Sequence, residues 1–433
     1  MISDNFNRHP WLSIREFEAC QLGLLRRHIG HCRLHSPFYR ELLGREGAEL
    51  DDITLANFIN LPLTDKTDFT VSNKDFLAVP QEQIVDIVLS SGTTGVPTTV
   101  MYTEHDLQRL AYNEATAFAG CGITRGDTAL LTCTIDRCFI AGLAYQMGLR
   151  QIGAGVIRNG NASLHGHCDL IRRFNPSVLI GVPTFLRKLA CFFYQAGIDP
   201  AGTSVRKLVC IGEPLRDAAM NPLKLCAELE KLWNAKAYST YATTEIVTSF
   251  CECEAQNGGH LTPDLAIVEI IDDNGRRLPP GAHGEVVITP LNVEAMPLLR
   301  FRTGDISFLM TDPCSCGRVT PRLGPILGRK SQMIKLKGTT LYPQSILSAL
   351  STMPDVTEYY VVATSEDSLV DQIIVHAAVA NGECSAHSIS ERLQAQLRVR
   401  TDVIIEPEEA VAQQVFRTGS RKAVRFVDRR IFQ

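Results

Sequence analysis

The sequence predicts an α/β fold with a large N-terminal domain of β-α layers, a β subdomain and a small α+β C-terminal domain. Three observations lead to this prediction. Short apolar runs alternate with helical stretches from about residue 80 to 290, hairpin-like strands follow residue 260, and a separate set of strands and helices follows Gly328. With 433 residues, 45% of them hydrophobic, the chain is long enough for two or three domains.

The N-terminal part reads as helical over residues 13 to 44, with the turn-like segment SPFYR at 36 to 40. The following apolar runs are IVDIVLS, TALLTC, AGVI, SVLIGVP and KLVCIGE. Helical stretches such as 105 to 118 and 184 to 196 lie between them. Apolar strands separated by helices are typical of a buried, largely parallel sheet, which we expect here.

The pattern of apolar runs and turns changes after residue 260. The runs AIVEIID and GEVVITPL flank the turn DDNGRR, which predicts hairpin-connected strands in a β subdomain over about 260 to 328. Further on, strands alternate with helices expected near 343 to 352 and 386 to 397. The predicted domains are therefore 1–328 and 329–433.

Composition and charge exclude several classes of protein. The net charge of -4 and pI near 6.3 argue against a nucleic-acid or anionic membrane partner. The N-terminus lacks a basic stretch followed by an apolar run, and no segment has the ~18 uninterrupted apolar residues of a membrane span. The 14 cysteines are scattered, which favours reduced thiols. We therefore expect a cytoplasmic protein.

The most informative stretch is SSGTTGVPTT at 90 to 99, between the apolar run DIVLS and a helix expected from about Glu104. Small residues and hydroxyls after a strand let backbone N–H groups approach a phosphate closely. The stretch lacks the Gly-Lys-Ser/Thr ending of a Walker loop, and GAGVIRNG at 153 to 160 misses the dinucleotide spacing. A nucleotide phosphate is the ligand we expect, although the stretch alone also fits an ordinary polar turn. The predicted phosphate-binding residues are Ser90, Ser91, Gly92, Thr93, Thr94 and Gly95.

SSGTTG with a following proline resembles the phosphate loop of the adenylate-forming superfamily, which includes acyl-coenzyme A synthetases, luciferases and peptide-synthetase adenylation domains. The family loop usually carries lysine where this chain has Val96. Further matches follow in the family's order, and together they are far more specific than the loop alone. The resemblance implies ATP as the nucleotide and acyl-AMP as the intermediate.

The segment YATTE at 241 to 245 resembles the family segment that contacts the nucleotide. The resemblance implies that the Tyr241 ring lies against adenine, that Thr244 faces phosphate, and that Glu245 helps to hold Mg²⁺. An anion beside a triphosphate needs such a cation. Ala242 and Thr243 belong to the same nucleotide-binding segment.

Two other segments complete the implied nucleotide site. Gly212, Glu213 and Pro214 resemble the strand end that lines the adenine pocket. RFRTGD is similar to the segment whose aspartate, here Asp305, accepts hydrogen bonds from both ribose hydroxyls. GRKSQMIKLKG resembles the family hinge, which implies that Arg329 lies near the ribose and phosphate.

The C-terminal segment FRTGSRKAVRFVDRR places Lys422 where the family has the lysine that bridges the attacking carboxylate and the α-phosphate. Such an ammonium stabilises the charge that shifts toward pyrophosphate. The resemblance also implies a mobile C-terminal domain that rotates about a hinge near Lys330 before thiol attack, with Gly338 at the thiol-binding face. Coenzyme A is the implied thiol.

Within the superfamily, the chain is most similar to the phenylacetate–coenzyme A ligase branch. The traits are SPFYRELL, LPLTDKTDF at 61 to 69, and PCSCGRVTPRLGPILGR at 313 to 329. This implies an aromatic or small hydrophobic acid and a homodimer, with Ile135, Phe139 and Tyr238 at the acid pocket. The pocket region at 134 to 150 departs from the Gly- and aromatic-rich version of phenylacetate activators.

Three alternatives stay open at this point. The first is a deazaflavin-adenylylating synthetase, which stops after AMP transfer. The second is a stand-alone adenylation enzyme that loads a carrier protein. The third is a non-catalytic nucleotide-binding module.

Two close cysteine pairs suggest a separate site. We expect Cys253, His260, Cys314 and Cys316 to hold a structural Zn²⁺, with Cys251 as an alternative ligand. Thiolates and imidazole suit tetrahedral zinc. Because C-x-C is less diagnostic than C-x2-C, free cysteines or a redox-labile pair are the alternative.

Overall fold

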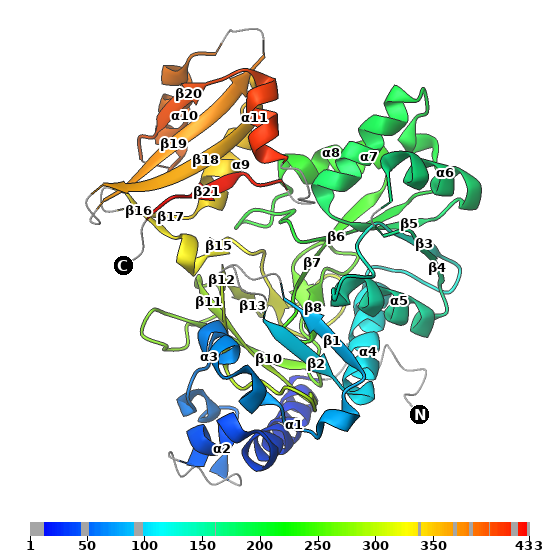
Figure 1. Ribbon diagram of the computed structural model, residues 1–433, viewed down its shortest axis with the longest axis vertical. Coiled ribbons are helices and arrows are strands. Elements are labelled where there is room, and N and C mark those ends of the chain that lie inside the picture. The colour runs from blue at the N-terminus through cyan, green and yellow to red at the C-terminus, as the bar shows by residue number, and fades with distance from the viewer. Residues whose placement is uncertain are drawn as a thin grey trace.

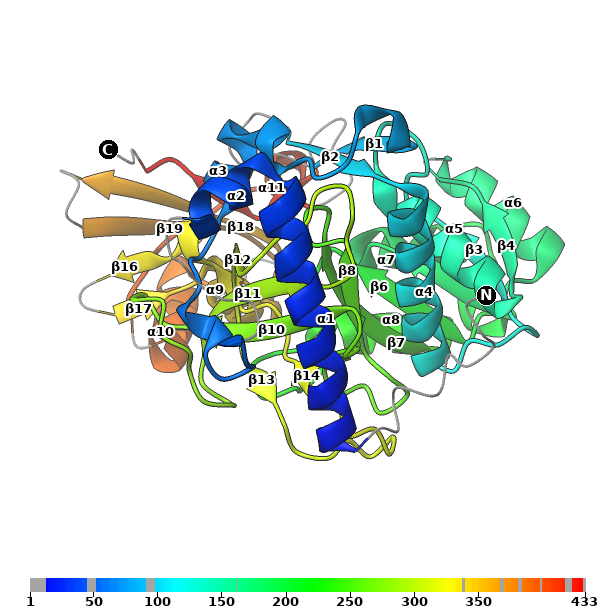
Figure 2. The ribbon, with the colours of Figure 1, turned by 90° about the horizontal axis from the view of Figure 1, so that it is seen from below.

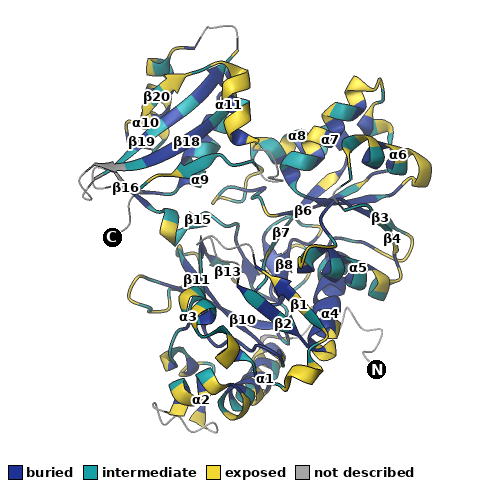
Figure 3. Ribbon diagram, viewed as in Figure 1, coloured by how far each residue is buried: buried dark blue, intermediate teal, exposed yellow. Residues whose placement is uncertain are grey.

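The computed structural model of the chain describes residues 13–44, 52–90, 98–160, 162–336, 339–366, 370–380, 384–397, 399–416 and 423–430. Figure 1 shows a smaller lobe at the upper left, coloured from yellow to red, that follows β15, and a large part below and to the right of it. Buried residues lie along the strands of both parts, and exposed residues lie on the outer faces of the helices (Figure 3). No helix within the described ranges is long and apolar enough to cross a membrane.

A six-stranded sheet forms the centre of the large part. Its order is β4-β3-β5-β6-β7-β8, and every neighbouring pair is parallel except the last. The strands are β3 (Thr128–Leu131), β4 (Gly155–Arg158), β5 (Val178–Gly181), β6 (Lys207–Ile211), β7 (Lys236–Thr243) and β8 (Thr248–Cys251). The predicted parallel sheet is therefore confirmed for TALLTC, AGVI, SVLIGVP and KLVCIGE.

The prediction was wrong for IVDIVLS, which lies outside that sheet. Its strand β1 (Asp86–Leu89) pairs antiparallel with β2 (Thr99–Tyr102) in a separate two-stranded ribbon. Ile87 and Leu89 are 48% and 42% exposed, so only one face of β1 is covered. An apolar run alone does not reveal whether one or both faces of a strand are buried.

Helices cover the central sheet, and two of them begin at residues that are recognisable helix starts in the sequence. Thr103 forms a capping box with Asp106 at the start of α4 (Glu104–Gly120), and Pro183 occupies the first turn of α7 (Pro183–Gln195). The others are α5 (Ile140–Ile152), α6 (Leu164–Phe174) and α8 (Lys224–Trp233). Short 3₁₀ helices occupy Phe58–Asn60, Asn73–Phe76, Gln81–Gln83, Pro200–Gly202 and Lys330–Gln332.

The N-terminal segment is helical, but SPFYR is not the predicted turn. The helix α1 (Ile14–His35) ends before Ser36, and α2 (Pro37–Gly44) begins at the next residue. The Ser36 hydroxyl accepts a hydrogen bond from the Tyr39 N–H at 3.4 Å and thereby caps α2. Proline at the first position of a helix costs no hydrogen bond, so the break is limited to Ser36.

The β subdomain is an antiparallel sheet of order β10-β11-β12-β15, which confirms the predicted hairpin between AIVEIID and GEVVITP. Its strands are β10 (Ala266–Ile271), β11 (Gly284–Pro290), β12 (Phe301–Ser307) and β15 (Gly328–Arg329). A smaller sheet contains β9 (Gly259–His260), β13 (Leu309–Met310) and β14 (Arg322–Leu323). Helix α1 lies across this region in Figure 2, and Gln21 donates to the Ala266 carbonyl at 3.0 Å.

The docking of α1 depends on a buried neutral histidine. His28 Nε2 lies 2.9 Å from the Leu298 carbonyl, whereas Nδ1 is buried without a hydrogen-bond partner in the described structure. Burial lowers the pKa of His28 to about 4. The folded pKa is thus below the unfolded value near 6.5, so the unfolded state binds more protons in this window.

We expect the free energy of unfolding to fall by about 3 kcal/mol between pH 6.5 and pH 4 because of His28. Urea titrations at several pH values measure this loss. His28→Gln should flatten the pH dependence, whereas His35→Gln, at an exposed position of the same helix, should leave it unchanged. Equal pH dependence in His28→Gln and the wild type would contradict the assignment.

The C-terminal lobe has a four-stranded sheet of order β20-β19-β18-β21. Two helices match the predicted segments near 343 to 352 and 386 to 397, and a third, α11, was not predicted. The elements are β16 (Ile334–Leu336), β17 (Thr339–Leu341), α9 (Pro343–Ser351), β18 (Val356–Glu366), β19 (Val370–Val379), α10 (Ala386–Leu397), β20 (Asp402–Ile405), α11 (Glu408–Val415) and β21 (Phe426–Asp428). The division of the chain at 328/329 stays a prediction.

Candidate active site

The site is built around the end of β7 and the turn that follows it. Tyr241 lies near the end of this strand, and Glu245 lies in the turn before β8 returns antiparallel. Val247, in the same turn, has a φ of +49°. Ligands of open α/β sheets bind at the carboxyl ends of the strands, so this turn is where a nucleotide site is expected.

Three predicted nucleotide-binding side chains are in direct contact. The Tyr241 hydroxyl donates to Asp305 Oδ2 at 2.8 Å, and Arg329 Nε donates to Asp305 Oδ1 at 3.1 Å. Asp305 on β12 and Arg329 on β15 are directly opposite each other in the sheet, which fixes this pairing. The structure therefore brings together residues that are 88 positions apart in the sequence.

Asp305 is buried, and burial raises its pKa although Arg329 and Tyr241 oppose the shift. Each carboxylate oxygen accepts one hydrogen bond within this trio and has lone-pair capacity for a further donor. The arrangement suits a carboxylate that receives hydroxyl hydrogens from a ribose.

Asp305→Asn should weaken AMP binding about 10-fold, because an amide accepts only through its oxygen and carries no charge. Isothermal titration calorimetry with AMP measures the change. Asp273→Asn, an exposed acid of the same subdomain, is the matched control and should leave the Kd unaltered. An unchanged Kd in Asp305→Asn would exclude Asp305 from the nucleotide site.

Glu245 is buried beside a cation that the sequence analysis did not assign to the site. Lys66 Nζ lies 2.8 Å from Glu245 Oε1. Burial by itself raises the pKa of Glu245, but the Lys66 ammonium outweighs it and holds the pKa below the ordinary value. An ionised, buried carboxylate whose partner is a flexible lysine fits the oxygen-donor chemistry of Mg²⁺.

The β1–β2 ribbon contacts the YATTE segment next to Glu245. The Tyr102 hydroxyl, at the end of β2, donates to the Thr244 carbonyl at 3.2 Å. Ala242 is exposed, and Thr243 is half-buried. Tyr102 is a positioning residue that sequence reasoning missed, since a tyrosine in an apolar strand has no distinguishing pattern.

Most of the predicted phosphate loop, namely Ser91, Gly92, Thr93, Thr94 and Gly95, lies outside the described residues. Ser90 is described, and its N–H donates to the Thr98 carbonyl at 2.9 Å, which joins the two ends of the loop. The buried Ser90 hydroxyl has no hydrogen-bond partner among the described residues. A buried hydroxyl in that position has a free donor for a ligand oxygen.

The segment from Gly212 to Pro214 follows β6 directly. Gly212 has a φ of +77°, which favours glycine. Glu213 accepts hydrogen bonds from the Thr184 N–H at 2.9 Å and the Thr184 hydroxyl at 2.8 Å. The Glu213 carboxylate therefore holds the first turn of α7. Any contribution of this segment to an adenine pocket comes from its backbone or from the residues next to Glu213.

The predicted acid-pocket residues differ in burial. Tyr238 on β7 is buried and Ile135 is half-buried in the same core cluster, whereas Phe139 is 38% exposed. The loop before α5 is tied to β1, because the Leu89 N–H donates to the Cys138 carbonyl at 2.9 Å. The structure thus joins Ile135 and Tyr238 in one core and leaves Phe139 outside it.

Comparisons with known proteins agree with this geometry. The sequence profile described as AMP-binding enzyme matches residues 43–294, and the profile described as AMP-binding enzyme C-terminal domain matches residues 338–430. The chain belongs to the AMP-binding enzyme family. The resemblance to the adenylate-forming superfamily is thereby confirmed.

Relatives of this AMP-binding enzyme point to the same branch as the sequence motifs. It is 32% identical to the phenylacetate-coenzyme A ligase of Thermus thermophilus over 82% of this chain and 80% of the relative. It is 27% identical to the phenylacetate-coenzyme A ligase of Escherichia coli over 91% of each chain. The predicted membership of the phenylacetate–coenzyme A ligase branch is confirmed.

Solved structures confirm the predicted fold class. A 2-hydroxyisobutyryl-CoA ligase in the postadenylation state has a TM-score of 0.86 and 24% identity, covering 99% of this chain and 93% of the other. The same ligase in the thioesterification state with CoA has a TM-score of 0.71 and 25% identity, covering 98% and 92%. The overall arrangement of this AMP-binding enzyme is therefore more similar to the first structure.

The AMP-binding enzyme also has a compact group of metal-ligating side chains. One ligand atom each from Cys253, His260, Cys314 and Cys316 lies within 4.8 Å of the others. The Cys253 and Cys314 sulfurs are 3.7 Å apart, and Cys316 Sγ is 3.4 Å from His260 Nε2. Tetrahedral zinc with Zn–S near 2.3 Å places two sulfurs about 3.8 Å apart and a sulfur about 3.6 Å from a nitrogen.

His260 presents the nitrogen that a metal needs. Its Nδ1 lies 2.8 Å from the Thr320 hydroxyl, which leaves Nε2 directed at the thiols. Burial and the nearby Arg318 and Arg322 lower the pKa of His260 to about 3, so the ring is neutral. A neutral imidazole oriented by a second hydrogen bond is typical of a zinc ligand. The four residues therefore fit zinc.

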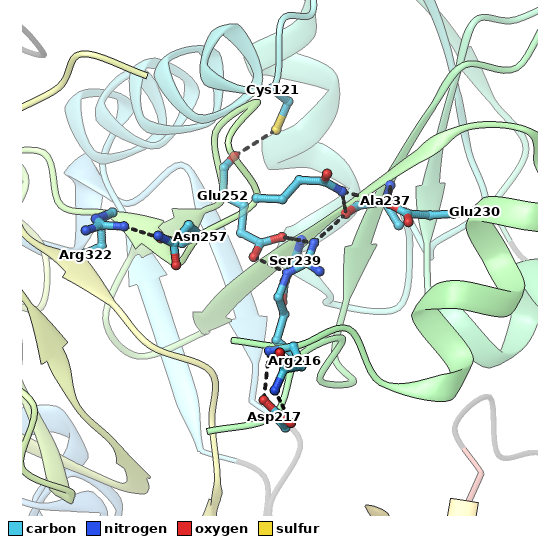
Figure 4. A network of polar contacts seen from close by, with 11 residues as sticks. Cys121, Arg216, Asp217, Glu230, Ala237, Ser239, Glu252, Asn257 and Arg322 are labelled. Carbon is cyan, nitrogen blue, oxygen red and sulfur yellow. Dashed lines mark hydrogen bonds and ion pairs between the residues drawn. The ribbon is translucent and has the colours of Figure 1, made fainter. Parts of the chain in front are cut away.

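The alternative ligand Cys251 does not belong to this group. Its sulfur lies 3.3 Å from Cys121 Sγ and accepts from the Thr240 hydroxyl at 3.0 Å. Between the two cysteines, the Glu252 carboxylate forms a buried ion pair with Arg216 at 2.8 Å (Figure 4). Cys251 thus contacts Cys121, whereas Cys253 contacts Cys314. The described cysteines form no disulfide.

Two predicted residues of this AMP-binding enzyme cannot be placed. Lys422 and Gly338 lie outside the described residues. Their assignments as catalytic lysine and thiol-binding glycine stay predictions from the sequence.

Proposed function

We propose that the protein is an ATP-dependent acid–thiol ligase that activates a carboxylic acid as acyl-AMP and then transfers the acyl group to coenzyme A. The observation that carries this proposal is the contact of Tyr241 and Arg329 with Asp305, at the same site as the buried Glu245. Similarity to two phenylacetate-coenzyme A ligases over most of the chain supports the acid–thiol chemistry.

In the first step, a carboxylate oxygen bonds to the α-phosphorus of ATP, the bond to the β-phosphate breaks, and pyrophosphate leaves. Asp305 and Tyr241 orient the nucleotide, and Lys422 stabilises the charge that develops. Mg²⁺, which Glu245 would hold, supplies further positive charge at the phosphates. In the second step, the coenzyme A thiolate attacks the acyl carbon and AMP leaves, after the thiol proton has passed to solvent.

We propose an arylacetic or small hydrophobic acid as the substrate. The half-buried Ile135, which packs against the core that contains Tyr238, offers apolar surface for such a group. The named relatives act on phenylacetate, which is of this class. The C-terminal lobe would turn about Lys330 between the two steps, with Gly338 at the thiol, and the zinc group would stabilise the β subdomain without taking part in the chemistry.

A panel of carboxylic acids tests the proposal by pyrophosphate release with and without coenzyme A. We expect at least one arylacetic or small hydrophobic acid to give coenzyme A-dependent turnover and a thioester product. If only the phosphopantetheine of a carrier protein accepts the acyl group, coenzyme A is not the thiol and that part of the proposal is wrong. A stable AMP adduct formed without any thiol requirement would overturn it in favour of an adenylylating synthetase.

A further inference from the structure

We propose that Lys66 binds the β- and γ-phosphates of ATP, and that it is released for this role when Mg²⁺ takes its place on Glu245. The inference rests on the proposed function, because it assigns a residue to the nucleotide of that reaction. Lys66 is the first residue of the short helix α3 (Lys66–Val71), within the segment LPLTDKTDF.

Neighbouring residues on the N-terminal and C-terminal sides of Lys66 fix its position. Asp65 caps α3, accepting from the Thr67 N–H at 2.7 Å and from the Asp68 N–H at 3.0 Å. The preceding Thr64 forms a bridge with Phe301 at the start of β12, the strand that also carries Asp305. The base of the Lys66 side chain is therefore held beside the nucleotide-binding strand.

The same helix contacts the end of the phosphate loop. The Thr70 hydroxyl lies 2.8 Å from the Thr98 hydroxyl, directly after the loop. Asn73, just beyond α3, donates to the Thr99 carbonyl at 2.9 Å. The Ser90 N–H donates to the Thr98 carbonyl, so α3 is joined to the point where both ends of the loop meet. Helix α3 therefore contacts the end of the loop through Thr70 and Glu245 through Lys66.

Charge balance indicates what the ammonium does when ATP arrives. Glu245 is buried and ionised, so an incoming triphosphate would meet a negative charge at this place. A divalent ion attracts a carboxylate more strongly than a single ammonium does, since it carries twice the charge. Lys66 is 29% exposed and unbranched, so its Nζ can turn to a phosphate oxygen without movement of α3.

The sequence gives an independent reason for a lysine here. The loop of this chain has Val96 and contains no basic residue from Ser90 to Thr99. A triphosphate needs positive charge beyond its magnesium ion, and an ammonium from α3 provides it. AMP lacks the β- and γ-phosphates, so the proposal predicts a selective effect on ATP.

Isothermal titration calorimetry with MgATP and with AMP, in the absence of any acid, tests the proposal. We expect Lys66→Met to weaken MgATP binding about 10- to 100-fold and to change AMP binding less than about 2-fold. Lys66→Arg should keep MgATP binding within about 3-fold of the wild type, because the charge is retained. Lys74→Met, at an exposed lysine of the nearby 3₁₀ helix Asn73–Phe76, is the matched control and should bind both nucleotides normally.

A double variant separates phosphate binding from the stability of the ion pair. Lys66→Met leaves Glu245 buried without its ammonium, whereas Lys66→Met with Glu245→Gln removes both charges. The double variant should regain the Tm that Lys66→Met loses, because no unpaired buried charge remains, and this measures the stability of the ion pair separately. Equal weakening of MgATP and AMP in Lys66→Met, or unchanged MgATP binding, would overturn the proposal. Acid-dependent pyrophosphate release by the wild type tests the proposed function separately, since these titrations need no turnover.

Discussion

Lys422→Ala is expected to reduce acid-dependent pyrophosphate formation about 10²- to 10³-fold, the usual effect of removing one electrostatic contact to a transition state. The ammonium would bridge the attacking carboxylate and the α-phosphate, so its loss raises the barrier of the first step only. Pyrophosphate exchange with a productive acid measures this step.

The second half-reaction is the internal control for this variant. Transfer from preformed acyl-AMP to coenzyme A should stay within about 3-fold of the wild type, because Lys422 would have left the site by then. This control also shows that the variant is folded. Wild-type exchange activity in Lys422→Ala would remove the lysine from the mechanism, and equal loss of both steps would mean that it only supports the fold.

Cys314→Ser is expected to eliminate bound zinc and to lower the Tm by about 5 °C or more. A bound metal adds its binding free energy to the native state, and about 3 kcal/mol shifts the Tm of a large domain by roughly this amount or more. Cys314 is buried and its sulfur is 3.7 Å from that of Cys253, so serine would leave an incomplete site. Elemental analysis of purified protein and thermal unfolding measure the two effects.

Cys251→Ser is the matched control, because Cys251 is two residues from Cys253 but contacts Cys121 instead. It should keep one zinc ion per chain. Zinc-free wild-type protein with the same Tm before and after chelator treatment would contradict the proposed metal site. Loss of zinc in Cys251→Ser but not in Cys314→Ser would show that Cys251, and not Cys314, is a zinc ligand.

Whether a strand is predicted correctly from its apolar pattern depends on whether both of its faces are buried. TALLTC and SVLIGVP form strands whose apolar residues are covered on both faces, and their patterns were interpreted correctly. IVDIVLS is comparably apolar, yet it forms an antiparallel ribbon with exposed Ile87 and Leu89. Local pattern reports apolarity, whereas the partner of a strand depends on distant segments.

The same limit applies to the site. Glu245 could be predicted because it lies in a contiguous motif, but its partner Lys66 is 179 positions away. Nothing in LPLTDKTDF marks one lysine as a nucleotide-site residue. Likewise, Glu213 was placed near adenine, while the structure shows that its carboxylate holds the start of α7.

The sequence alone determined the family, and it predicted the order of the nucleotide-binding segments and four candidate zinc ligands. These features depend on residue types within short contiguous segments, which can be recognised in the sequence. Only the tertiary structure decided that Tyr241 and Arg329 contact Asp305, that Cys251 turns to Cys121, and that Lys66 neutralises Glu245. The physical reason is that strand pairing and helix docking set which side chains share a buried space, and neither leaves a local signature.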